Sequence, residues 1–351
     1  MRKLVGTREH GFRCARPVRR ALLSALAALL LCSVSTAHAA DKIVAAGNRL
    51  SAIAPLYIAI EKGLFAAEGL DVSLVHLTSA TEIGAGIASG SAQFGMTAFS
   101  AGIYTLAGKG GLKVIAGGYE EHPGFHGVAL VVNKAAYDRG LRKPSDLVGR
   151  RVAITTVGSG SHNQLARLAK KYGFRFDDIQ IVPLQTLANE VSAVKGGQVD
   201  VSPLPATLAQ QVEASGAGNI IAWMGDEVPT QFGGLFAAPA IIANNRELAV
   251  RFVRAYGKAI QIYDRAFQRK GPDGKPAKGE DYDELIKIIA GHTGEVPASL
   301  ALALPYFDPE ARLQVSDIAE QIEVYKSLKL VDQSMRVDAV VDRSFVPSAK
   351  K

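Results

Sequence analysis

Short apolar runs alternate with longer amphipathic stretches along most of the chain. The runs are rich in Val, Ile and Ala, as strands buried on both faces are. Between them, apolar side chains recur every three to four positions, which is typical of helices that bury one face. The strands predicted in this way cover residues 42–46, 70–77, 93–96, 113–116, 128–132, 152–155, 179–182, 199–201, 220–223 and 235–242. This alternation predicts an α/β fold with mostly parallel sheets.

Proline, glycine and serine mark the ends of the predicted helices. Pro55 suits the first turn of a helix, and Gly63 suits the position just after the last turn. The helices predicted in this way cover residues 56–62, 81–89 and 99–107, with others beginning at Ser161, Leu187 and Ala206 and a short turn at 65–68. Beyond residue 242 the pattern is largely helical, with an apolar stripe at Phe252, Tyr256, Ile260 and Tyr263.

Two irregular stretches, at residues 117–127 and 225–234, interrupt the alternation. Each contains Glu, Pro, Phe and Gly before an apolar strand. Residues 90–95 also line up with residues 197–202, and both segments lie between a helix and a strand. The pattern suggests two similar α/β halves joined by two crossings, although turn residues recur at such positions in any two α/β units.

The first 39 residues differ from the rest and resemble an export signal. Residues 1–20 carry basic side chains against the single acid Glu9, and an apolar run follows at 21–34. This run is shorter than the ~20 apolar residues of a membrane-spanning helix. Residues 37–39, Ala-His-Ala, then supply the small-x-small pattern that signal peptidase recognises. We therefore expect a periplasmic protein, cleaved after Ala39 or Ala40.

The leader resembles two other export signals in part. Cys32 faintly resembles a lipoprotein site, but Leu31 occupies the position where a small residue is needed, so we do not expect a lipid anchor. Arg19 and Arg20 partly match a twin-arginine signal, although Val18 replaces the usual Ser or Thr. Sec and twin-arginine export both remain open, and both lead to the periplasm.

Removing the leader changes the charge and the cysteine content. The whole chain carries +7, and residues 1–39 contribute 7 − 1 = +6, which leaves +1. So small a charge gives no reason to expect nucleic acid as a partner. Cys14 and Cys32 both lie in the leader, so the remaining 351 − 39 = 312 residues have no disulfide and no thiol chemistry. A chain of this length usually forms two lobes.

The residues around the first predicted helix carry a specific resemblance. Residues 54–65, Ala-Pro-Leu-Tyr-Ile-Ala-Ile-Glu-Lys-Gly-Leu-Phe, and 68–72, Glu-Gly-Leu-Asp-Val, resemble the opening of the nitrate/sulfonate/taurine-type periplasmic solute-binding proteins, also described as thiamine-pyrimidine-synthase-like. Ser89-Gly90 with Gln93-Phe94-Gly95 looks like the next block, with Gln93 where Asp is usual. Later blocks are similar at 143–152, 197–201 and 239–263, so the resemblance covers nearly all of residues 42–346.

The resemblance implies a two-lobed type II periplasmic-binding-protein fold, with two mixed, mostly parallel sheets, flanking helices and a double-crossover hinge. Lobe 1 would comprise residues 42–122 plus 236–351, and lobe 2 residues 126–230, with crossings near 121–127 and 228–235. The hinge would lie at Glu121, His122, Val228 and Pro229. The resemblance also implies a monomer that captures a small-molecule ligand by hinge closure and delivers it to an ABC permease with a cytoplasmic ATPase.

The fold class also selects candidate ligand-binding residues. In open α/β sheets, ligands lie beyond the carboxyl ends of the strands, so the loops that follow the strands should line the cleft. On lobe 1 this rule selects Asn48, Arg49, Ser51, Ser79, Ala80, Thr81, Thr97, Phe99 and Ser100. On lobe 2 it selects Gly158, Ser159, Gly160, Ser161, His162, Gln185, Pro203, Leu204, the rest of the loop to Thr207, and Trp223.

The loop Gly158–His162 makes the strongest physical case for a ligand contact. It follows a strand and opens a helix that runs to Tyr172. Glycine allows the backbone to approach a ligand closely, and the free N–H groups of a helix N-terminus favour an anion. Ser159 and Ser161 add hydroxyl donors, although Ser161 could instead simply cap the helix.

Three larger side chains each have an alternative to ligand contact. Arg49 could clamp a carboxylate or sulfonate through two hydrogen bonds, or simply be solvated. Phe99 could stack on a ligand ring or belong to the core. Trp223, the single tryptophan, could close over the ligand or fill the space between the lobes.

We expect neither a metal nor a cofactor. The cluster that most suggests a metal consists of Glu120, Glu121, His122 and His126, but a Pro-Gly pair breaks any helix between its histidines. The acids of residues 270–283 lack the spacing of a calcium loop, so a solvated loop is expected there.

The sequence favours a binding protein over an enzyme. It contains no G-x-S-x-G elbow, Walker loop, G-x-G-x-x-G fingerprint or H-E-x-x-H. The expected cleft residues are mostly small and neutral, which suits reversible capture of a small organic anion of sulfonate or carboxylate type. Enzymes of the same fold are the alternative: pyrimidine synthases, which carry a cysteine-rich motif, or menaquinone-pathway dehydratases, which are cytoplasmic. A periplasmic sensor subunit is a further alternative.

Overall fold

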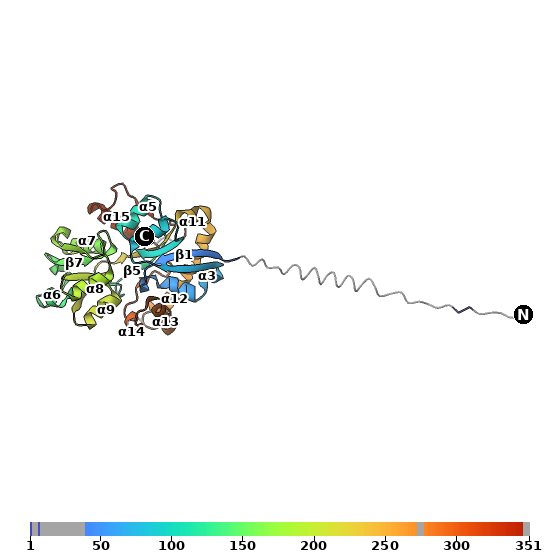
Figure 1. Cartoon of the computed structure of the whole chain (residues 1–351), viewed down its shortest axis with the longest axis horizontal. Coiled ribbons are helices and arrows are strands. Elements are labelled where there is room, and N and C mark those ends of the chain that lie inside the picture. Colours follow the sequence, from blue (N-terminus) through green and yellow to red (C-terminus); the bar gives the residue numbers. More distant parts are fainter. Residues whose placement is uncertain (2–5, 8–38, 272–276, 347–351) are drawn as a thin grey trace. The chain divides into compact units, whose positions relative to one another are not determined.

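A computed structural model describes residues 1, 6–7, 39–271 and 277–346. Residues 40–351 form one unit, separate from residues 1–39. The predicted signal peptide lies almost entirely outside the described residues, as do Cys14 and Cys32, so it stays a prediction. Within its described residues, the unit formed by residues 40–351 contains three β-sheets and the helices that cover them (Figure 1).

The first sheet has the strand order β2-β1-β3-β12-β4. β1 pairs in parallel with β2 and β3, whereas β12 runs antiparallel to both β3 and β4. The strands that form this sheet are β1 (Asp41–Gly47), β2 (Leu70–His76), β3 (Phe94–Ala98), β4 (Lys113–Gly117) and β12 (Gly233–Ala237). Five predicted strands therefore share one sheet, and the fifth, β12, begins two residues before its predicted start.

The second sheet has the strand order β10-β6-β9-β7-β8. β7 pairs in parallel with β8 and β9, whereas β6 runs antiparallel to β9 and β10. The strands that form this sheet are β6 (Val128–Asn133), β7 (Arg151–Ile154), β8 (Gln180–Pro183), β9 (Val201–Pro205) and β10 (Gly218–Trp223).

The two sheets repeat one topology. Reading from β2 gives 2-1-3-12-4, and reading from β8 gives 8-7-9-6-10, so β12 and β6 hold the same place. Each of these two strands follows an irregular stretch, and each is antiparallel to both of its neighbours. The similar residues 90–95 and 197–202 run into the first two residues of β3 and β9, which correspond in this scheme. The internal duplication suggested by the sequence is therefore real at the level of topology.

The irregular stretches form a small third sheet with the order β11-β5-β13. β5 (Tyr119–Glu121) pairs antiparallel with β11 (Thr230–Gln231) and with β13 (Tyr306–Phe307). The predicted hinge residues lie at its ends: Glu121 ends β5, His122 follows it, and Val228 and Pro229 precede β11. The two crossings are thus hydrogen-bonded to each other and to a C-terminal strand that the sequence did not predict.

One predicted strand is wrong in its second half. The apolar run 235–242 is extended only as far as Ala237, and Pro239 then begins helix α11 (Pro239–Asn244). Proline cannot donate a ladder hydrogen bond, yet it suits the first turn of a helix, which explains the change. The short turn predicted at 65–68 is likewise a single helical turn, α3 (Leu64–Ala67).

Helix α12 (Arg246–Phe267) confirms the predicted apolar stripe. Asn245 caps it, because the Asn245 side chain accepts a hydrogen bond from the amide of Leu248 at 3.2 Å. Phe252, Tyr256, Ile260 and Tyr263 are all fully buried. This face packs on α2 (Ala54–Glu61) and α3, so segments far apart in sequence lie together (Figure 1).

The remaining helices connect the strands or cover the sheets. They are α4 (Ala80–Ala88), α5 (Ala101–Gly108), α6 (Lys134–Asp138), α7 (Gly160–Tyr172), α8 (Leu187–Lys195), α9 (Ala206–Ala214), α10 (Met224–Glu227), α13 (Tyr282–Thr293), α14 (Pro297–Leu300), α15 (Val315–Ser327) and α16 (Val337–Val340), with 3-10 turns η1 (Ser51–Ile53), η2 (Pro144–Leu147) and η3 (Phe176–Asp178). Apolar side chains from both sheets join one contiguous core. None of the described helices is long and apolar enough to cross a membrane.

Candidate functional site

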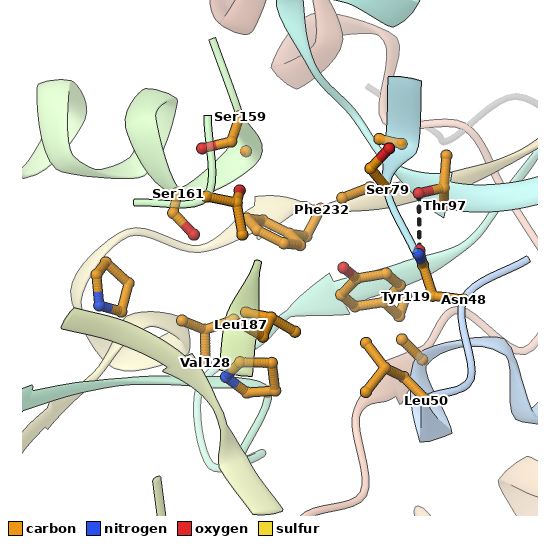
Figure 2. A pocket seen from close by; sticks show the side chains of 18 of the residues that line it. Asn48, Leu50, Ser79, Thr97, Tyr119, Val128, Ser159, Ser161, Leu187 and Phe232 are labelled. Carbon is orange, nitrogen blue, oxygen red and sulfur yellow. Dashed lines mark hydrogen bonds between the residues drawn. The ribbon is translucent and has the colours of Figure 1, made fainter. Parts of the chain in front are cut away.

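A cavity lies where the carboxyl ends of strands from both large sheets meet. It encloses about 1140 Å³ of empty volume, part of which is open to solvent. Figure 2 shows Ser159 and Ser161 on one side and Asn48, Ser79 and Thr97 on the other. The walls therefore come from loops that follow β1, β2 and β3 and from loops that follow β7, β8 and β9, as expected for facing α/β sheets.

Most of the predicted ligand-binding residues line this cavity. The lining includes Asn48, Ser51, Ser79, Ala80, Thr81, Thr97, Phe99, Ser100, Ser159, Gly160, Ser161, Gln185, Pro203, Pro205, Ala206 and Thr207. The rule that selected them is purely topological, so their convergence supports the site. Which of them contact a ligand stays a prediction.

Two predicted residues face away from the cavity. Leu204 lies between Pro203 and Pro205 on β9, and because side chains of a strand alternate between faces, its own packs into the core on the opposite face. Trp223 is half-buried at the end of β10, and its ring stacks on His126 with 4.0 Å between centroids. The structure therefore places Trp223 at a contact with His126 rather than over the cavity.

For Arg49 and Phe99 the structure favours the alternative to ligand contact. Arg49 is exposed and is not among the lining residues, which agrees with a solvated side chain. Phe99 reaches the lining, but its side chain is fully buried. Its ring lies 5.6 Å from that of Tyr104 and 5.7 Å from that of Phe236, as a core residue does.

Gly158 and His162 support the cavity wall from behind. The Nδ1 atom of His162 accepts a hydrogen bond from the Gly158 amide at 2.8 Å, and burial lowers the pKa of this imidazole to about 4. His162 is therefore neutral near pH 7. Gly158 has a φ of +84°, and its carbonyl accepts a hydrogen bond from the Ala101 amide at 2.9 Å. The glycine thus allows a close approach to α5, not to a ligand as predicted.

Serine residues cap three of the helices that begin at the cavity. The hydroxyl oxygens of Ser79, Ser100 and Ser159 accept hydrogen bonds from the amides three residues later, at 3.2, 3.2 and 3.3 Å. The cap of α7 is therefore Ser159, not Ser161 as the sequence suggested, and Ser161 lies in the first turn. Because each capping oxygen uses a lone pair, its hydroxyl hydrogen remains able to donate to a ligand.

The cavity combines helix N-termini with an uncharged lining. α4, α5, α7, α8 and α9 all begin with residues at or next to it. Each N-terminus carries a partial positive charge and unpaired backbone N–H groups. No Asp, Glu, Lys, Arg or His occurs among the described residues that line it. An anion here would be held by neutral donors and helix dipoles alone.

Asn48 and Thr97 are oriented by hydrogen bonds to the protein. The Thr97 hydroxyl donates to Asn48 Oδ1 at 3.0 Å (Figure 2). Asn48 Nδ2 in turn donates to the Leu77 carbonyl at 3.0 Å. The amide of Asn48 is thereby held in one orientation at the first-sheet wall.

Sequence reasoning missed the aromatic floor of the cavity. Tyr119 and Phe232 come from the two crossings, and their ring centroids lie 5.4 Å apart between the two walls (Figure 2). Other lining residues that the strand-end rule did not select are Leu50, Ala52, Thr78, Ala98, Gly127, Val128, Thr155, Thr156, Leu187, Ala303 and Pro305. The aromatic residues in each irregular stretch were the available signal.

Residues of the cluster that most suggested a metal have other partners in the structure. Glu121 Oε2 accepts a hydrogen bond from the Val128 amide at 3.1 Å, while the His122 ring stacks on Tyr306 at 4.2 Å. Burial raises the pKa of Glu120 to about 7 and that of Glu121 to about 8. Among the described residues, no group of three His, Cys, Asp or Glu side chains is placed to hold an ion.

Comparison with known proteins places the chain in a family. Residues 51–264 match the family described as NMT1/THI5 like, which is more than half of the chain. The chain belongs to this family. A comparison of this NMT1/THI5-like protein with the curated proteins finds no match.

Solved structures of periplasmic binding proteins share the fold of this NMT1/THI5-like protein. The alkanesulfonate-binding protein SsuA from Xanthomonas axonopodis pv. citri, bound to MOPS, aligns with a TM-score of 0.69 and 19% identity, over 88% of this chain and 100% of that one. The periplasmic aliphatic sulphonate-binding protein SsuA from Escherichia coli aligns with 0.66 and 17%, over 89% and 94%. The periplasmic nitrate-binding protein NrtA from Synechocystis PCC 6803 aligns with 0.65 and 16%, over 86% and 86%. The predicted α/β periplasmic-binding fold with mixed sheets is confirmed.

Proposed function

We propose that this protein is the periplasmic solute-binding subunit of an ABC importer and that it captures a small organic anion of sulfonate or carboxylate type. The observation that carries the proposal is the cavity between the two large sheets, which brings together helix N-termini and hydroxyl groups without a charged side chain. The sulfonate- and nitrate-binding proteins that share the fold support an anionic solute.

The anionic part of the solute is expected at the start of α7. Ser159 and Ser161 supply hydroxyl donors there, and the backbone N–H groups of the first turn lie beside them. Oxygen atoms of a sulfonate or carboxylate accept hydrogen bonds from such groups, and the helix dipole adds to the attraction.

The organic part of the solute is expected against the apolar surfaces. Leu50, Val128, Leu187 and Phe232 present hydrocarbon to the same cavity (Figure 2). Burial of an alkyl or aryl group there is favourable at about 25 cal/mol per Å² of apolar surface. A bare inorganic ion would leave these walls without contact, so an organic anion fits better than nitrate.

The lining also favours binding over catalysis. The Ser and Thr hydroxyls of the lining would need an adjacent base such as His, Lys or a carboxylate to act as nucleophiles, and the described lining contains none of these. The family includes synthases, and the pyrimidine synthases that the sequence resembles use a cysteine-rich motif. The two cysteines of this chain, Cys14 and Cys32, both lie in the predicted leader.

Thermal-shift screening of the purified protein tests the proposal. The probes would be MOPS, linear alkanesulfonates, aromatic carboxylates and nitrate, with alkylamines as the matched cationic control. We expect stabilisation by at least one organic anion and none by the amines. Stabilisation by amines alone, or turnover of any bound compound, would contradict the proposal.

Ser161→Ala is expected to weaken binding of the anion found in this way. Ser161 is not the cap of α7, so its loss removes a donor without the roughly 1 kcal/mol cost of removing a cap. Loss of one donor to a charged acceptor corresponds to roughly 1–3 kcal/mol in the binding free energy, measured by calorimetry. Ser159→Ala should lower both affinity and stability, whereas Ser192→Ala, on the exposed face of α8, should change neither much. Unchanged affinity in Ser161→Ala would remove this turn from the site.

Hinge closure is the proposed mechanism of capture. Lobe 1 (42–122 plus 236–351) and lobe 2 (126–230) would close around the solute as the two crossings, at 121–127 and 228–235, bend. The solute binds the closed form more tightly than the open form, and this difference in affinity stabilises the closed form. The closed protein would then dock on the permease. Solute-dependent stimulation of ATP hydrolysis by a candidate partner permease with its ATPase would separate transport from a sensing role.

A further inference from the structure

The outer side of α7 carries a regular set of polar contacts to α15. Tyr325 donates its hydroxyl hydrogen to the Ser159 carbonyl at 2.8 Å, and Asn163 Nδ2 donates to the Gln321 carbonyl at 3.1 Å. One helical turn further on, the Arg167 guanidinium contacts the Asp317 carboxylate at 2.8 Å. We call these three contacts the α7–α15 ladder.

The spacing of the ladder follows from helix geometry. On the α7 side the contacts are made by Ser159, which caps the helix, and by Asn163 and Arg167. Their partners on α15 are, in the same order, Tyr325, Gln321 and Asp317. Residues four apart lie on one face of a helix, so each helix presents a single polar row to the other. The opposite numbering shows that the two helices run antiparallel.

The α15 side of the ladder is anchored away from α7. Gln321 Oε1 accepts a hydrogen bond from the Tyr104 hydroxyl of α5 at 2.9 Å, and Asp317 Oδ2 accepts one from the Gln231 amide of β11 at 2.9 Å. Ile318, Ile322 and Tyr325 pack in a core cluster that includes residues of α5 and β4. The ladder therefore joins a helix of the second sheet to the first sheet and to a crossing.

The ladder is shielded from solvent. Asn163 and Gln321 are each 2% exposed and Tyr325 is fully buried, while the side chains of Arg167 and Asp317 are 12% and 16% exposed. Buried hydrogen bonds are not readily exchanged for water, so loss of one partner leaves the other unsatisfied. None of the side chains that make these contacts lines the cavity, although Ser159 does.

We propose that α15 is a positioning element for the solute-binding end of α7. Tyr325 holds the Ser159 carbonyl, and Gln321 and Asp317 hold the next two turns, so they fix Ser159–Ser161 relative to the first-sheet wall in the arrangement of this structure. The proposed hinge closure would then turn about these contacts rather than break them. The proposal rests on the proposed function in so far as the positioned turn binds the solute. Its consequence is that residues without solute contact set the affinity and the dissociation rate.

Tyr325→Phe tests the proposal with Tyr256→Phe as its matched control. Both tyrosines are fully buried and donate to a backbone carbonyl at 2.8 Å, but Tyr256 lies on α12 and donates to Gly117. Hydrogen exchange of the amides of residues 160–164 would be measured without solute, and MOPS and alkanesulfonate binding by calorimetry and stopped-flow. We expect Tyr325→Phe to raise this exchange and the dissociation rate about five- to tenfold, and Tyr256→Phe to change neither.

Arg167→Gln provides a second variant that is less buried and should fold. It removes the third contact and should raise exchange in the same turn by a smaller factor. Exchange at 160–164 that matches the unmodified protein in both variants would overturn the proposal, as would raised exchange with unchanged affinity for a bound probe. If no probe binds the unmodified protein, the proposed solute class fails, and the exchange measurement alone still decides whether α15 positions this turn.

Discussion

Gly158→Ala is expected to weaken solute binding about tenfold or more, whereas Gly173→Ala should leave it unchanged. The two glycines flank α7 with φ of +84° and +74°, so alanine introduces similar backbone strain at each. Their surroundings differ. A Cβ on Gly158 would lie 2.9 Å from the Cβ of Ala101, whereas one on Gly173 would meet nothing within 4 Å. Relief of that overlap must move α7 away from α5, and such overpacking costs roughly 1–3 kcal/mol.

Two measurements separate the effect on binding from the effect on folding. Urea unfolding should show a loss of about 1 kcal/mol from backbone strain in both variants, and a further loss of roughly 1–3 kcal/mol from overpacking in Gly158→Ala. Calorimetry with the anion found by screening should show a loss of affinity in Gly158→Ala alone, because 1.4 kcal/mol corresponds to a factor of ten. Equal affinities in the two variants would mean that the approach of Gly158 to Ala101 has no part in binding.

Glu121→Gln is expected to raise the free energy of unfolding at about pH 8. It should also remove the fall of this free energy with rising pH that Glu121 causes. Glu121 is 1% exposed, its Oε1 atom has no hydrogen-bond partner, and burial raises its pKa to about 8 from an ordinary value of 4.5. The folded protein therefore retains a proton there that the unfolded chain has lost. Stability is present in full below the unfolded pKa and falls as pH rises to about 8, by at most about 1.4 kcal/mol per pH unit.

The other buried groups define where this effect can be seen alone. Glu120 and Glu190, whose pKa values burial raises to about 7, make stability fall with pH up to that value. Burial lowers the pKa of His162 to about 4, so this residue makes stability rise with pH up to about pH 6.5. Between about pH 7 and pH 8 the slope should come mainly from Glu121.

Urea unfolding at a series of pH values provides the measurement. Glu121→Gln should flatten the dependence between about pH 7 and pH 8, since the amide resembles the protonated carboxyl and can still accept from the Val128 amide. Glu190→Gln is the matched control, because Glu190 is also 1% exposed but accepts from Ser202 within the second sheet. It should leave this upper part of the profile in place. A profile for Glu121→Gln that parallels the original would refute the assignment.

The main strands could be predicted because each is a short apolar run between turn residues. Errors arose where the pattern was locally ambiguous. The run that includes Leu235 and Ile242 stays apolar through Pro239, so hydrophobicity alone could not show that the strand ends at Ala237 and a helix begins. Strands β11 and β13 contain two residues each, which is too short for any alternation to be visible.

The two walls of the site could be predicted from topology alone. The position of a loop follows from the strand before it, so the rule that ligands lie beyond strand ends identified the loops that form both walls. Alternation within β9, which turns Leu204 into the core, requires the register of the strand to be known. The contacts of Trp223 with His126 and of Tyr325 with Ser159 join segments far apart in sequence, and no local pattern encodes such pairs.

The position of β12 has a consequence for the order in which the protein can fold. In the first sheet β4 pairs with β12 and not with β3, so the sheet has a gap until residues 233–237 have been synthesised. All strands of the second sheet lie between residues 128 and 223, an uninterrupted segment of the chain. The middle of the polypeptide can therefore complete its sheet first, while the N-terminal strands wait for a segment made more than a hundred residues later.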